Sequence, residues 1–504
     1  MQGTANHSFP TCSCCVSSLF TLAKCLKCAV ASSRKLSAVS NSSHPILVSP
    51  RCVPSLDAHF RPASLAMRAF REQARRASNP QTVRMALEQT DGSVSHFVTE
   101  IFSEAANQLE ANYQHIERIV KFLLWSRGGW RIYFDGPANL AAKLDAHYRD
   151  DATGRFDSEI VCKKMFDRRI EIINTRDIPA ERALAKPLGR HLGGCRIGFD
   201  LGGSDRKTSA VIDGKVVFSE ETEWNPYFQT DPQYHFDGIM DSLKKAAAHL
   251  PRVEAIGGSA AGIYVNNRVK VASLFRGVPP DVFQKRVRDM FLDIQKLWKV
   301  PFEVVNDGEV TALAASMSLG VNSVLGISLG TSTAGGWVNA DGNITSWVNE
   351  LAFVPVDCNP AAPRDEWSGD YGCGVQYFSQ QCVARLLAPA GIEAPADMPF
   401  PEKLKLVQSL MKQGDERARK IYQTIGVYLG YGIAHFANFY DLRHVLILGR
   451  VTSGEGGDII LNGAKEILKL EFPELAAQIA FHIPDENDKR HGQAIAAASL
   501  PDIG

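Results

Sequence analysis

Two short stretches rich in glycine and hydroxyl side chains most constrain how this chain can fold. GFDLGGSDRKTSAV covers residues 198–211, and GISLGTSTAGGW covers residues 326–337. Each contains an apolar run followed by a Gly-rich segment and a second strand-like run, so each is predicted to be a tight turn between two strands. Successive backbone N–H groups in such turns bind anions. Two copies in one chain indicate one ligand held from two sides.

Strands and helices alternate around these two turns. The dipeptide Asp213-Gly214 is a hairpin signal between two of the strands. The apolar patterns predict strands at 195–201, 209–213 and 215–221, a helix at 237–250, a strand at 253–265, a helix at 283–298, a strand at 302–308, a helix at 309–320, and strands at 323–330 and 335–345. Strands followed by helices, twice over, predict an α/β protein of two similar halves.

In the first turn, Gly202 and Gly203 are expected to bring backbone N–H groups close to a phosphate, and Ser204 adds a hydroxyl donor. Asp200 ends the preceding strand and is expected to hold Mg²⁺ through water, because magnesium keeps several waters. A Gly-rich hairpin without a ligand is the alternative interpretation.

The second turn follows the same logic with Gly330, Thr331 and Ser332. A nucleoside triphosphate between the two hairpins is therefore the expected ligand. The sequence contains no G-x-x-x-x-G-K-[ST] loop, so a P-loop is excluded as the binding mode. No G-x-G-x-x-G opens a helix, which disfavours a dinucleotide-binding site.

The segment VVNDGEVTAL, residues 304–313, places an acid at a strand end before a helix. Asp307 can take the proton from a substrate hydroxyl as that hydroxyl attacks a γ-phosphoryl group. Asn306 offers a donor and an acceptor to a polyol. The alternative is that Asp307 caps the helix that begins near Glu309.

Together these segments resemble the ROK family (repressors, open reading frames and kinases) of the actin, Hsp70 and sugar-kinase superfamily. The resemblance spans residues 195–500 and rests on five segments in order: GFDLGGSDRK, VVNDGEVTALAA, GISLGTSTAGG, the helix and strand at 426–449, and HGQAIAAASL. It implies two ribonuclease-H-like (actin-like ATPase) lobes, at 191–322 and 323–504, around a nucleotide cleft.

The resemblance further implies ATP-dependent and Mg²⁺-dependent phosphorylation of a sugar or sugar-like hydroxyl. By position, Asp307 is the general base, and Asn306 and Glu350 contact the sugar. Gly449 and Gly454 face the adenosine. The rival readings are a non-catalytic sensing protein, because the family contains repressors, and an ATPase of the same superfamily.

The sugar-binding part of the family pattern is incomplete. The family's Glu-x-Gly-His motif keeps its Glu350, but Phe353 stands in place of the histidine. Of the zinc-binding cysteine cluster only Cys373 remains, so no zinc is predicted. The glutamate expected after that cluster is Val375. Replacement polar contacts are sought at Trp367, Asp370 and Gln376.

The phosphate and adenosine motifs also depart from the family. Ser204-Asp205 replaces the usual Thr-Lys pair, and Arg450 replaces the second adenosine glycine. These changes leave open an altered substrate or a loss of activity.

Residues 1–78 are predicted to be a disordered leader. They are basic and rich in serine, and the first acidic residue is Asp57. This composition is typical of an organelle transit peptide, with a plastid favoured over a mitochondrion or the cytoplasm. A signal peptide around VSSLFTLA and a plain disordered tail are the alternatives, and CLKC at 25–28 is at most half of a zinc site.

Residues 79–190 are predicted to be a mostly helical accessory region of unknown role. Apolar positions at helical spacing favour amphipathic helices within 94–125, and residues 130–148 predict a strand, a turn and a helix. Packing, dimerisation as a homodimer, or shaping of the neighbouring site are the roles considered.

Bulk composition narrows the partners. Net charge is zero and hydrophobic residues make up 45%, which disfavours a nucleic-acid surface, and no apolar run is long enough to span a membrane. The expected partner is a small sugar or polyol.

Overall fold

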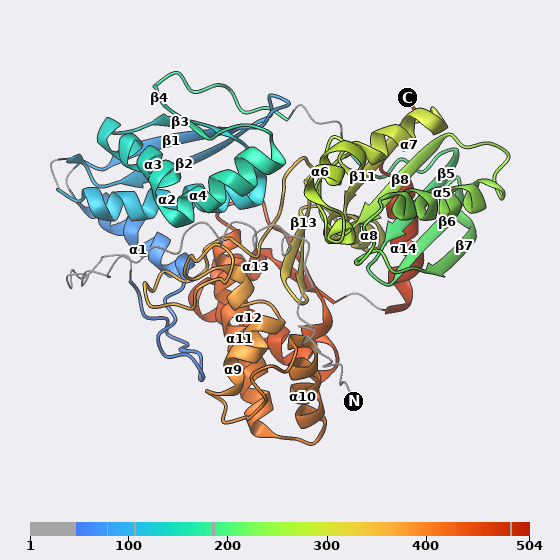
Figure 1. The fold of residues 1–504 in the computed structure, drawn as a ribbon. Helices are drawn as coiled ribbons and strands as arrows, with labels where there is room; N and C mark the ends of the chain where they lie inside the picture. Colours follow the sequence, from blue (N-terminus) through green and yellow to red (C-terminus); the bar gives the residue numbers. More distant parts are fainter. Residues whose placement is uncertain (1–46, 78, 105–106, 184–186, 484–485) are drawn as a thin grey trace, which may run out of the picture.

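The structure is a computed structural model that describes residues 47–77, 79–104, 107–183, 187–483 and 486–504. Three parts are visible in Figure 1: an N-terminal unit (79–183) at upper left, lobe 1 (195–306) at upper right, and lobe 2 (323–483) below. Helix α8 (Asp307–Leu319) joins the two lobes.

Lobe 1 is built on a five-stranded sheet with the order β7-β6-β5-β8-β11, in which β5, β6 and β7 form an antiparallel meander and β8 and β11 run parallel to β5. Its elements are β5 (Cys195–Leu201), β6 (Asp205–Ile212), β7 (Lys215–Glu223), α5 (Gln233–Ala247), β8 (Ala255–Ala260), β9 (Ile263–Val265), β10 (Arg268–Val271), η5 (Ser273–Phe275), α6 (Pro280–Val282), η6 (Phe283–Val287), α7 (Met290–Trp298) and β11 (Phe302–Asn306). The hairpin predicted at Asp213-Gly214 connects β6 to β7, with positive φ at both residues.

Lobe 2 repeats the same strand order in the sheet β13-β12-β14-β15, where β13 is antiparallel to β12 and β14 and β15 are parallel to it. The third strand of the meander is reduced to a bridge between Val338 and Ile344. Its elements are β12 (Val324–Leu329), β13 (Thr333–Val338), η7 (Gly374–Gln376), α9 (Gln380–Leu387), α10 (Phe400–Lys412), α11 (Glu416–Phe436), β14 (His444–Leu448), η8 (Arg450–Thr452), α12 (Glu455–Glu471), α13 (Pro473–Gln478) and β15 (Ala480–His482). The prediction of two similar halves is confirmed.

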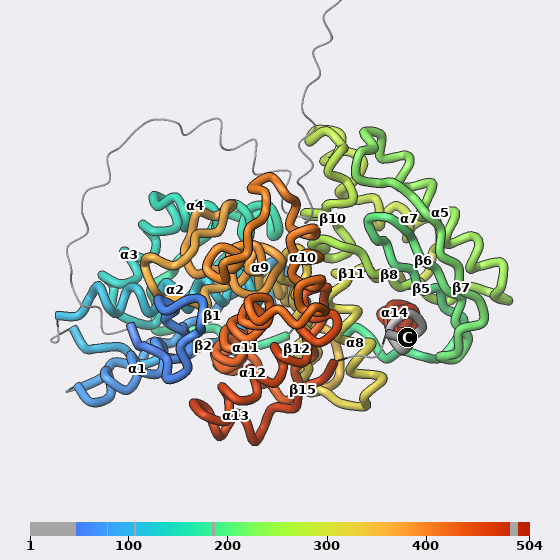
Figure 2. Tube along the Cα trace, turned by 90° about the horizontal axis from the view of Figure 1, so that it is seen from below, coloured from blue at the N-terminus to red at the C-terminus, as the bar shows by residue number. Residues whose placement is uncertain are grey.

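The last helix, α14 (Glu486–Ala498), returns to lobe 1 and packs on β5 and β8. Two glycines of these buried strands allow the approach, because a Cβ on Gly198 would overlap the carbonyl of Ala494 and one on Gly257 that of Ala497. Figure 2 shows α14 beside the strands of lobe 1, while α11 and α12 lie together in lobe 2. The C-terminal lobe predicted over 323–504 therefore ends before α14.

The N-terminal unit is a mixed α/β unit, which corrects the prediction that it is mostly helical. Its sheet has the order β2-β1-β3-β4. The elements are β1 (Gln81–Glu88), β2 (Val94–Ile101), α2 (Leu109–Arg127), β3 (Arg131–Asp135), α3 (Ala138–Asp150), α4 (Ala152–Asp157), the π-helix η4 (Ser158–Met165) and β4 (Glu171–Asn174). Residues 94–101 form a strand because they pair with β1 across the Asp91-Gly92 turn, a pairing that helical spacing does not reveal.

Residues 47–77 are ordered, so the leader predicted over 1–78 is wrong in this part. Helix α1 (Ala63–Arg76) packs on α11 and β2, its buried Phe70 stacks on His115 of α2, and Phe60 before it is 1% exposed. The amphipathic spacing of α1 outweighs its basic composition. Residues 1–46 of the predicted leader lie outside the described residues.

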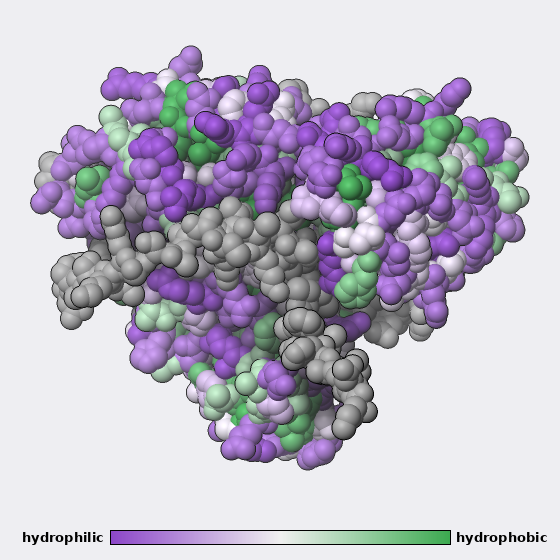
Figure 3. All heavy atoms as spheres, in the orientation of Figure 1, coloured by the Kyte–Doolittle hydropathy of each residue, from purple (hydrophilic) through white to green (hydrophobic). Residues whose placement is uncertain are grey.

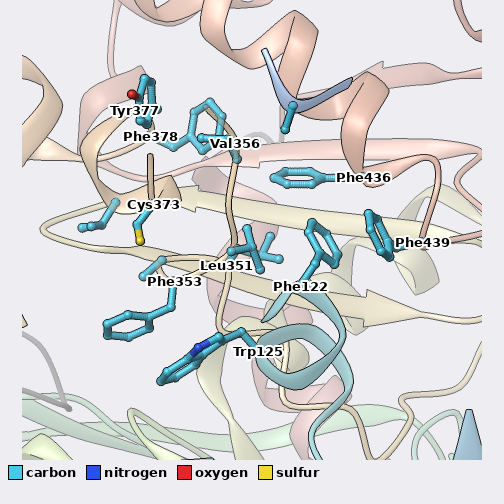
Figure 4. Close-up of a cluster of buried hydrophobic side chains, with 14 of the residues drawn as sticks. Phe122, Trp125, Leu351, Phe353, Val356, Cys373, Tyr377, Phe378, Phe436 and Phe439 are labelled. Atoms are coloured by element: carbon cyan, nitrogen blue, oxygen red, sulfur yellow. The ribbon is translucent and has the colours of Figure 1, made fainter. Parts of the chain in front are cut away.

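The N-terminal unit shares one continuous hydrophobic core with lobe 2. Figure 4 shows Phe122 of α2 beside Phe439, and the two rings stack with centroids 3.7 Å apart. Polar side chains cover most of the face drawn in Figure 3, with small apolar patches between them. In the described part of the chain, no helix combines the length and the apolar character needed to cross a bilayer.

Candidate active site

The first glycine turn is a tight β5–β6 hairpin. The N–H of Gly202 donates to the carbonyl of Asp205 at 2.9 Å and closes the turn, while the carbonyl of Gly202 accepts from the Trp224 indole at 2.8 Å. Residue 203 must be glycine, because a Cβ there would overlap the hydroxyl of Tyr227. Ser204 is exposed, and its hydroxyl donates to the Asp205 carboxylate at 2.8 Å.

The second glycine turn joins β12 to β13 in the same manner. The N–H of Gly330 donates back to the carbonyl of Ser332 at 3.0 Å, and the carbonyl of Gly330 accepts from Gln380 at the start of α9. Thr331 and Ser332 are half-buried at the tip. In both hairpins the first glycine closes the turn, so the next two residues form the tip that a phosphate would meet.

The predicted adenosine glycines follow β14. Gly449 has φ 98° and abuts the end of β12, since a Cβ would overlap the carbonyl of Leu329 next to the second hairpin. Gly454 has φ 72° and precedes α12, with open space where its side chain would be. Arg450 begins a short 3₁₀ turn between them.

Asn306 and Asp307 lie where β11 ends and α8 begins. Asn306 is the helix cap: its Oδ1 accepts from the N–H of Gly308 at 2.7 Å, and its Nδ2 donates to the carbonyl of Gly262 at 2.7 Å. The cap assigned to Asp307 as an alternative thus belongs mainly to Asn306, although Asp307 Oδ1 also lies 3.0 Å from the same N–H. One N–H of the Asn306 amide remains for a substrate.

The carboxylate of Asp307 is open to solvent but surrounded by protein. This environment, together with the negative charge of Asp200, raises the pKa of Asp307 to about 6. The group is therefore mostly ionised at neutral pH and still basic enough to accept a proton.

Asp200 lies at the end of β5, beside two other acids. Burial raises its pKa, whereas a hydrogen bond from Ser259 and the charge of Lys207 oppose the rise. Lys207 stands opposite Asp200 in the β5–β6 ladder, with its Nζ 4.0 Å from Asp200 and 3.0 Å from Asp205. A lysine thus reaches the first hairpin although position 205 is an aspartate.

Glu350 completes the acidic group. Its burial and the charge of Asp307 raise the pKa of Glu350 to about 8, so the two carboxyl groups lie close enough to interact electrostatically. The preceding Asn349 has φ 51°, and its amide is fixed by Glu309 at 2.6 Å and by Tyr440 at 2.8 Å. This left-handed residue turns the chain immediately before Glu350.

The negative charges of the site suit a magnesium ion. Asp205 and Asp307 both lie close enough to Asp200 for their charges to interact, and a divalent cation would relieve that repulsion. Among the described residues, no three His, Cys, Asp or Glu side chains form a metal-binding group by themselves. A magnesium ion here would take most of its ligands from phosphates and water.

The substitutions in the sugar motif have structural explanations. Phe353 stacks on Trp125 of α2, with ring centroids 4.1 Å apart (Figure 4). Asp370, sought as a replacement sugar contact, is instead buried in ion pairs with Arg118 and Lys121 at 3.0 and 3.1 Å. The expectation for Asp370 is therefore wrong.

The other two replacement contacts and the remaining cysteine lie nearby. Gln376 donates to Gln381 at 3.2 Å, and Trp367 is half-buried beside Asp365. Cys373 is fully buried, and burial raises the pKa of its thiol.

Sequence reasoning missed three residues near the reacting groups: Ser259, Tyr264 and Lys207. Tyr264 is close enough to Asp307 that burial and this charge together raise its pKa. Only Lys207 carried a signal in the sequence, since it lies two strand positions after Asp205 and so shares a sheet face with it.

A cavity of about 390 Å³ lies at the junction of the N-terminal unit with both lobes. Asn306 and Glu309 form part of its wall, together with Trp347. The wall contains neither lysine nor arginine and none of the hairpin residues, so this cavity does not correspond to the phosphate site.

The repeated sheets, the helix α8 that joins them and the glycine hairpin in each lobe define the actin-like ATPase fold. The ROK family matches residues 196–472. A glucokinase from Halalkalibacterium halodurans is 30% identical over 307 residues, which cover 57% of this chain and 89% of the relative. This chain belongs to the ROK family.

Solved ROK structures are similar to it at lower identity. The ROK hexokinase from Thermus thermophilus is 18% identical, with a TM-score of 0.47 over 61% of this chain and 98% of the hexokinase. A ROK glucokinase from Streptomyces griseus, solved with glucose and AMPPNP, is 19% identical, with a TM-score of 0.42 over 60% of this chain and 99% of the glucokinase.

Proposed function

We propose that the protein is a kinase that uses ATP and Mg²⁺ to phosphorylate a hydroxyl of a sugar or sugar-like polyol. The observation that carries the proposal is Asp307, a solvent-accessible carboxylate with a pKa of about 6 that interacts electrostatically with Glu350 and Asp200. Membership of the ROK family and the glucokinase relative support the sugar as acceptor.

Asp307 acts as the general base in this proposal. Its ionised carboxylate accepts the proton of the sugar hydroxyl while that oxygen attacks the γ-phosphorus. Glu350, with a pKa of about 8, is mainly protonated at pH 7 and donates a hydrogen bond to another sugar hydroxyl. The free N–H of Asn306 gives a second contact.

The hairpin tips and Lys207 bind the phosphates. Gly203 and Ser204 approach from lobe 1, and Thr331 and Ser332 approach from lobe 2. Bound Mg²⁺, held through water by Asp200, would neutralise the charge that develops on the phosphates. Gly202 and Gly330 shape the two turns, Gly449 lets the chain after β14 pass close to Leu329, and Gly454 leaves open space for the adenosine.

ADP release tests the proposal. The chain from residue 47 onward would be assayed with ATP and Mg²⁺ against hexoses, amino sugars, ketoses and polyols. Asp307→Asn is expected to lower sugar-dependent turnover by about a hundredfold or more. Asp341→Asn, in an exposed turn, is the matched control and is expected to keep full activity.

The same assay separates the rival functions. ADP release that no sugar changes would identify an ATPase of this superfamily. Tight ATP binding without turnover would exclude catalysis and leave a sensing protein, an outcome in line with the lost histidine at Phe353.

We also propose that the leader directs the protein to a plastid, on the basis of its basic, serine-rich composition. Residues 1–46 fused to a fluorescent protein should accumulate in plastids of a plant cell, and a mitochondrial or cytosolic signal would contradict this. Size-exclusion chromatography with light scattering would test the homodimer.

A further inference from the structure

The end of helix α2 is joined to the segment that carries Glu350. The N–H of Glu350 donates to the carbonyl of Trp125 at 2.9 Å, and the N–H of Asn349 donates to the carbonyl of Ser126 at 2.8 Å. The last carbonyl groups of a helix have no partner within the helix, so these bonds satisfy acceptors that would otherwise be unpaired. The N-terminal unit therefore fixes the backbone on which Glu350 stands.

The side chain of Trp125 makes a further contact with the segment that carries Glu350. Its fully buried indole stacks on Phe353 with centroids 4.1 Å apart and an interplanar angle of 24° (Figure 4). The N–H of Phe353 in turn donates to the carbonyl of Glu350 at 3.3 Å. Trp125 thus contacts both ends of the four-residue turn that begins at Glu350.

A buried charge network fixes the orientation of the indole. The indole N–H of Trp125 donates to Asp157 at 2.8 Å. Lys121, one turn earlier on α2, is fully buried, with its Nζ 2.9 Å from both carboxylate oxygens of Asp157 and 3.1 Å from Asp370. Arg118 pairs with Asp370 at 3.0 Å. Moving any member would leave a buried charge without its partner, so the network resists displacement.

We infer that Trp125 is a positioning residue for the Glu350 carboxyl group, and that the N-terminal unit thereby determines how tightly the site holds its sugar. This inference rests on the proposed kinase function. A carboxyl group displaced by about 1 Å loses much of its hydrogen bond to a substrate hydroxyl. The phosphate hairpins belong to β5–β6 and β12–β13, so the effect of Trp125 falls on the sugar and not on ATP.

Three substitutions test the inference in the chain that begins at residue 47. Trp125→Leu removes both the stacking on Phe353 and the bond to Asp157, and Trp125→Phe keeps an aromatic ring as a milder change. Trp130→Leu is the matched control, because this half-buried tryptophan of the same unit packs on the guanidinium of Arg131 at 4.1 Å. Circular-dichroism melting confirms that each variant folds.

Trp125→Leu is expected to raise the KM for the sugar by about ten- to a hundredfold, with the KM for ATP unchanged. It should also shift the pH above which kcat/KM falls, because that fall is expected to report deprotonation of Glu350. Trp125→Phe should act in the same direction by a smaller factor, and Trp130→Leu should change neither value. Folded Trp125 variants with the wild-type sugar KM and pH profile would overturn the inference, as would equal losses for sugar and ATP.

Crystal structures of Trp125→Phe and Trp130→Leu give a second readout that needs no turnover. The Glu350 carboxyl group should be displaced in the first and unmoved in the second. If the wild type phosphorylates no sugar, the kinase proposal fails, and the position of Glu350 still decides the inference: an unmoved carboxyl group in Trp125→Phe refutes it.

Discussion

At the scale of single residues, the proposed reaction depends on two electrostatically coupled carboxyl groups with different acidities. Asp307 has a pKa of about 6 and Glu350 of about 8. At pH 7 one is therefore mainly a carboxylate and the other mainly a carboxylic acid. A base and a hydrogen-bond donor of the same chemical type can thus work side by side, each defined by its surroundings.

This difference predicts a bell-shaped dependence of kcat/KM on pH. Activity requires ionised Asp307, so it should rise as the pH passes about 6, and it requires protonated Glu350, so it should fall above about 8. Glu350→Gln cannot ionise at this position and should lose the alkaline limb while keeping the acid limb. Persistence of the alkaline limb in Glu350→Gln would show that another group controls it.

Lys207 is expected to bind the phosphates of ATP. Its Nζ already lies beside Asp205 and Asp200 at the first hairpin. Lys207→Met should raise the KM for ATP about tenfold, the scale of one charged hydrogen bond, and leave the KM for the sugar unchanged. Steady-state kinetics with varied ATP measures this. Lys215→Met, at an exposed lysine on β7, is the control, and a similar change there would discount the role of Lys207.

The candidate site residues that the sequence indicated are those whose signal is local. Asp307 stands at a strand end before a helix, and the residues of each hairpin tip are consecutive, so neighbouring residues point to them. Trp125 and Tyr264 carried no such signal, because they meet Glu350 and Asp307 only through pairings between distant segments. The assignment of Asp370 failed for the same reason: its cationic partners lie about 250 residues earlier, on α2.

At the scale of elements, the two lobes each contain a glycine hairpin of the same kind. In the proposed function, the backbone of each hairpin must come close to a phosphate of the nucleotide. Gly203→Ala should disrupt the first hairpin, because the new Cβ would overlap the hydroxyl of Tyr227. The affinity for ATP should fall about 5- to 150-fold, as about 1–3 kcal/mol of strain in a packed turn implies. Isothermal titration calorimetry with an ATP analogue measures the change.

Two further variants sharpen this measurement. Gly193→Ala is the matched control, since open space surrounds its position, and it should bind like the wild type. The double variant Gly203→Ala/Tyr227→Ala removes the overlap and should recover part of the affinity. Wild-type affinity in Gly203→Ala alone would mean that the hairpin does not meet the nucleotide.

Elements were predictable where hydrophobic spacing and turns agree. Strands β5 and β11 and helix α8 follow their sequence patterns closely, because β5 lies between Gly194 and Gly202, β11 follows Pro301, and α8 ends at Gly320. Strand β6 begins four residues earlier than its apolar pattern predicts, and the strand predicted at 253–265 is divided into β8 and β9. Strand β2 was mistaken for helix, because its pairing with β1 supplies a stabilisation that the helical spacing of nearby residues masks. The packing of α14 on lobe 1 depends on contacts between distant segments, so no local sequence pattern predicts it.

At the scale of the whole molecule, the N-terminal unit is not an appendage. It shares the core of lobe 2 through Phe122 and Phe439, and it reaches lobe 1 through Asp167, which pairs with Lys270 at 2.6 Å and Arg288 at 2.9 Å. A unit that contacts both lobes limits how they move relative to each other. The family fold and the added unit therefore form one structural body around Glu350 and Asp307.

The ordered segment 47–77 gives the last prediction. Phe60, Leu65, Met67 and Phe70 of this segment are at most 6% exposed, and each such side chain contributes about 1.5–3 kcal/mol of burial. A chain that begins at residue 79 should therefore melt about 5–10 °C lower than one that begins at residue 47. The chain from residue 47 should match the full-length protein in thermal melts, because all described contacts are retained. Equal melting temperatures of the chains from 47 and 79 would show that this segment adds nothing to the stability of the core. The ring of Phe60 lies 4.8 Å from that of Tyr428, which predicts instead that the segment is part of the core.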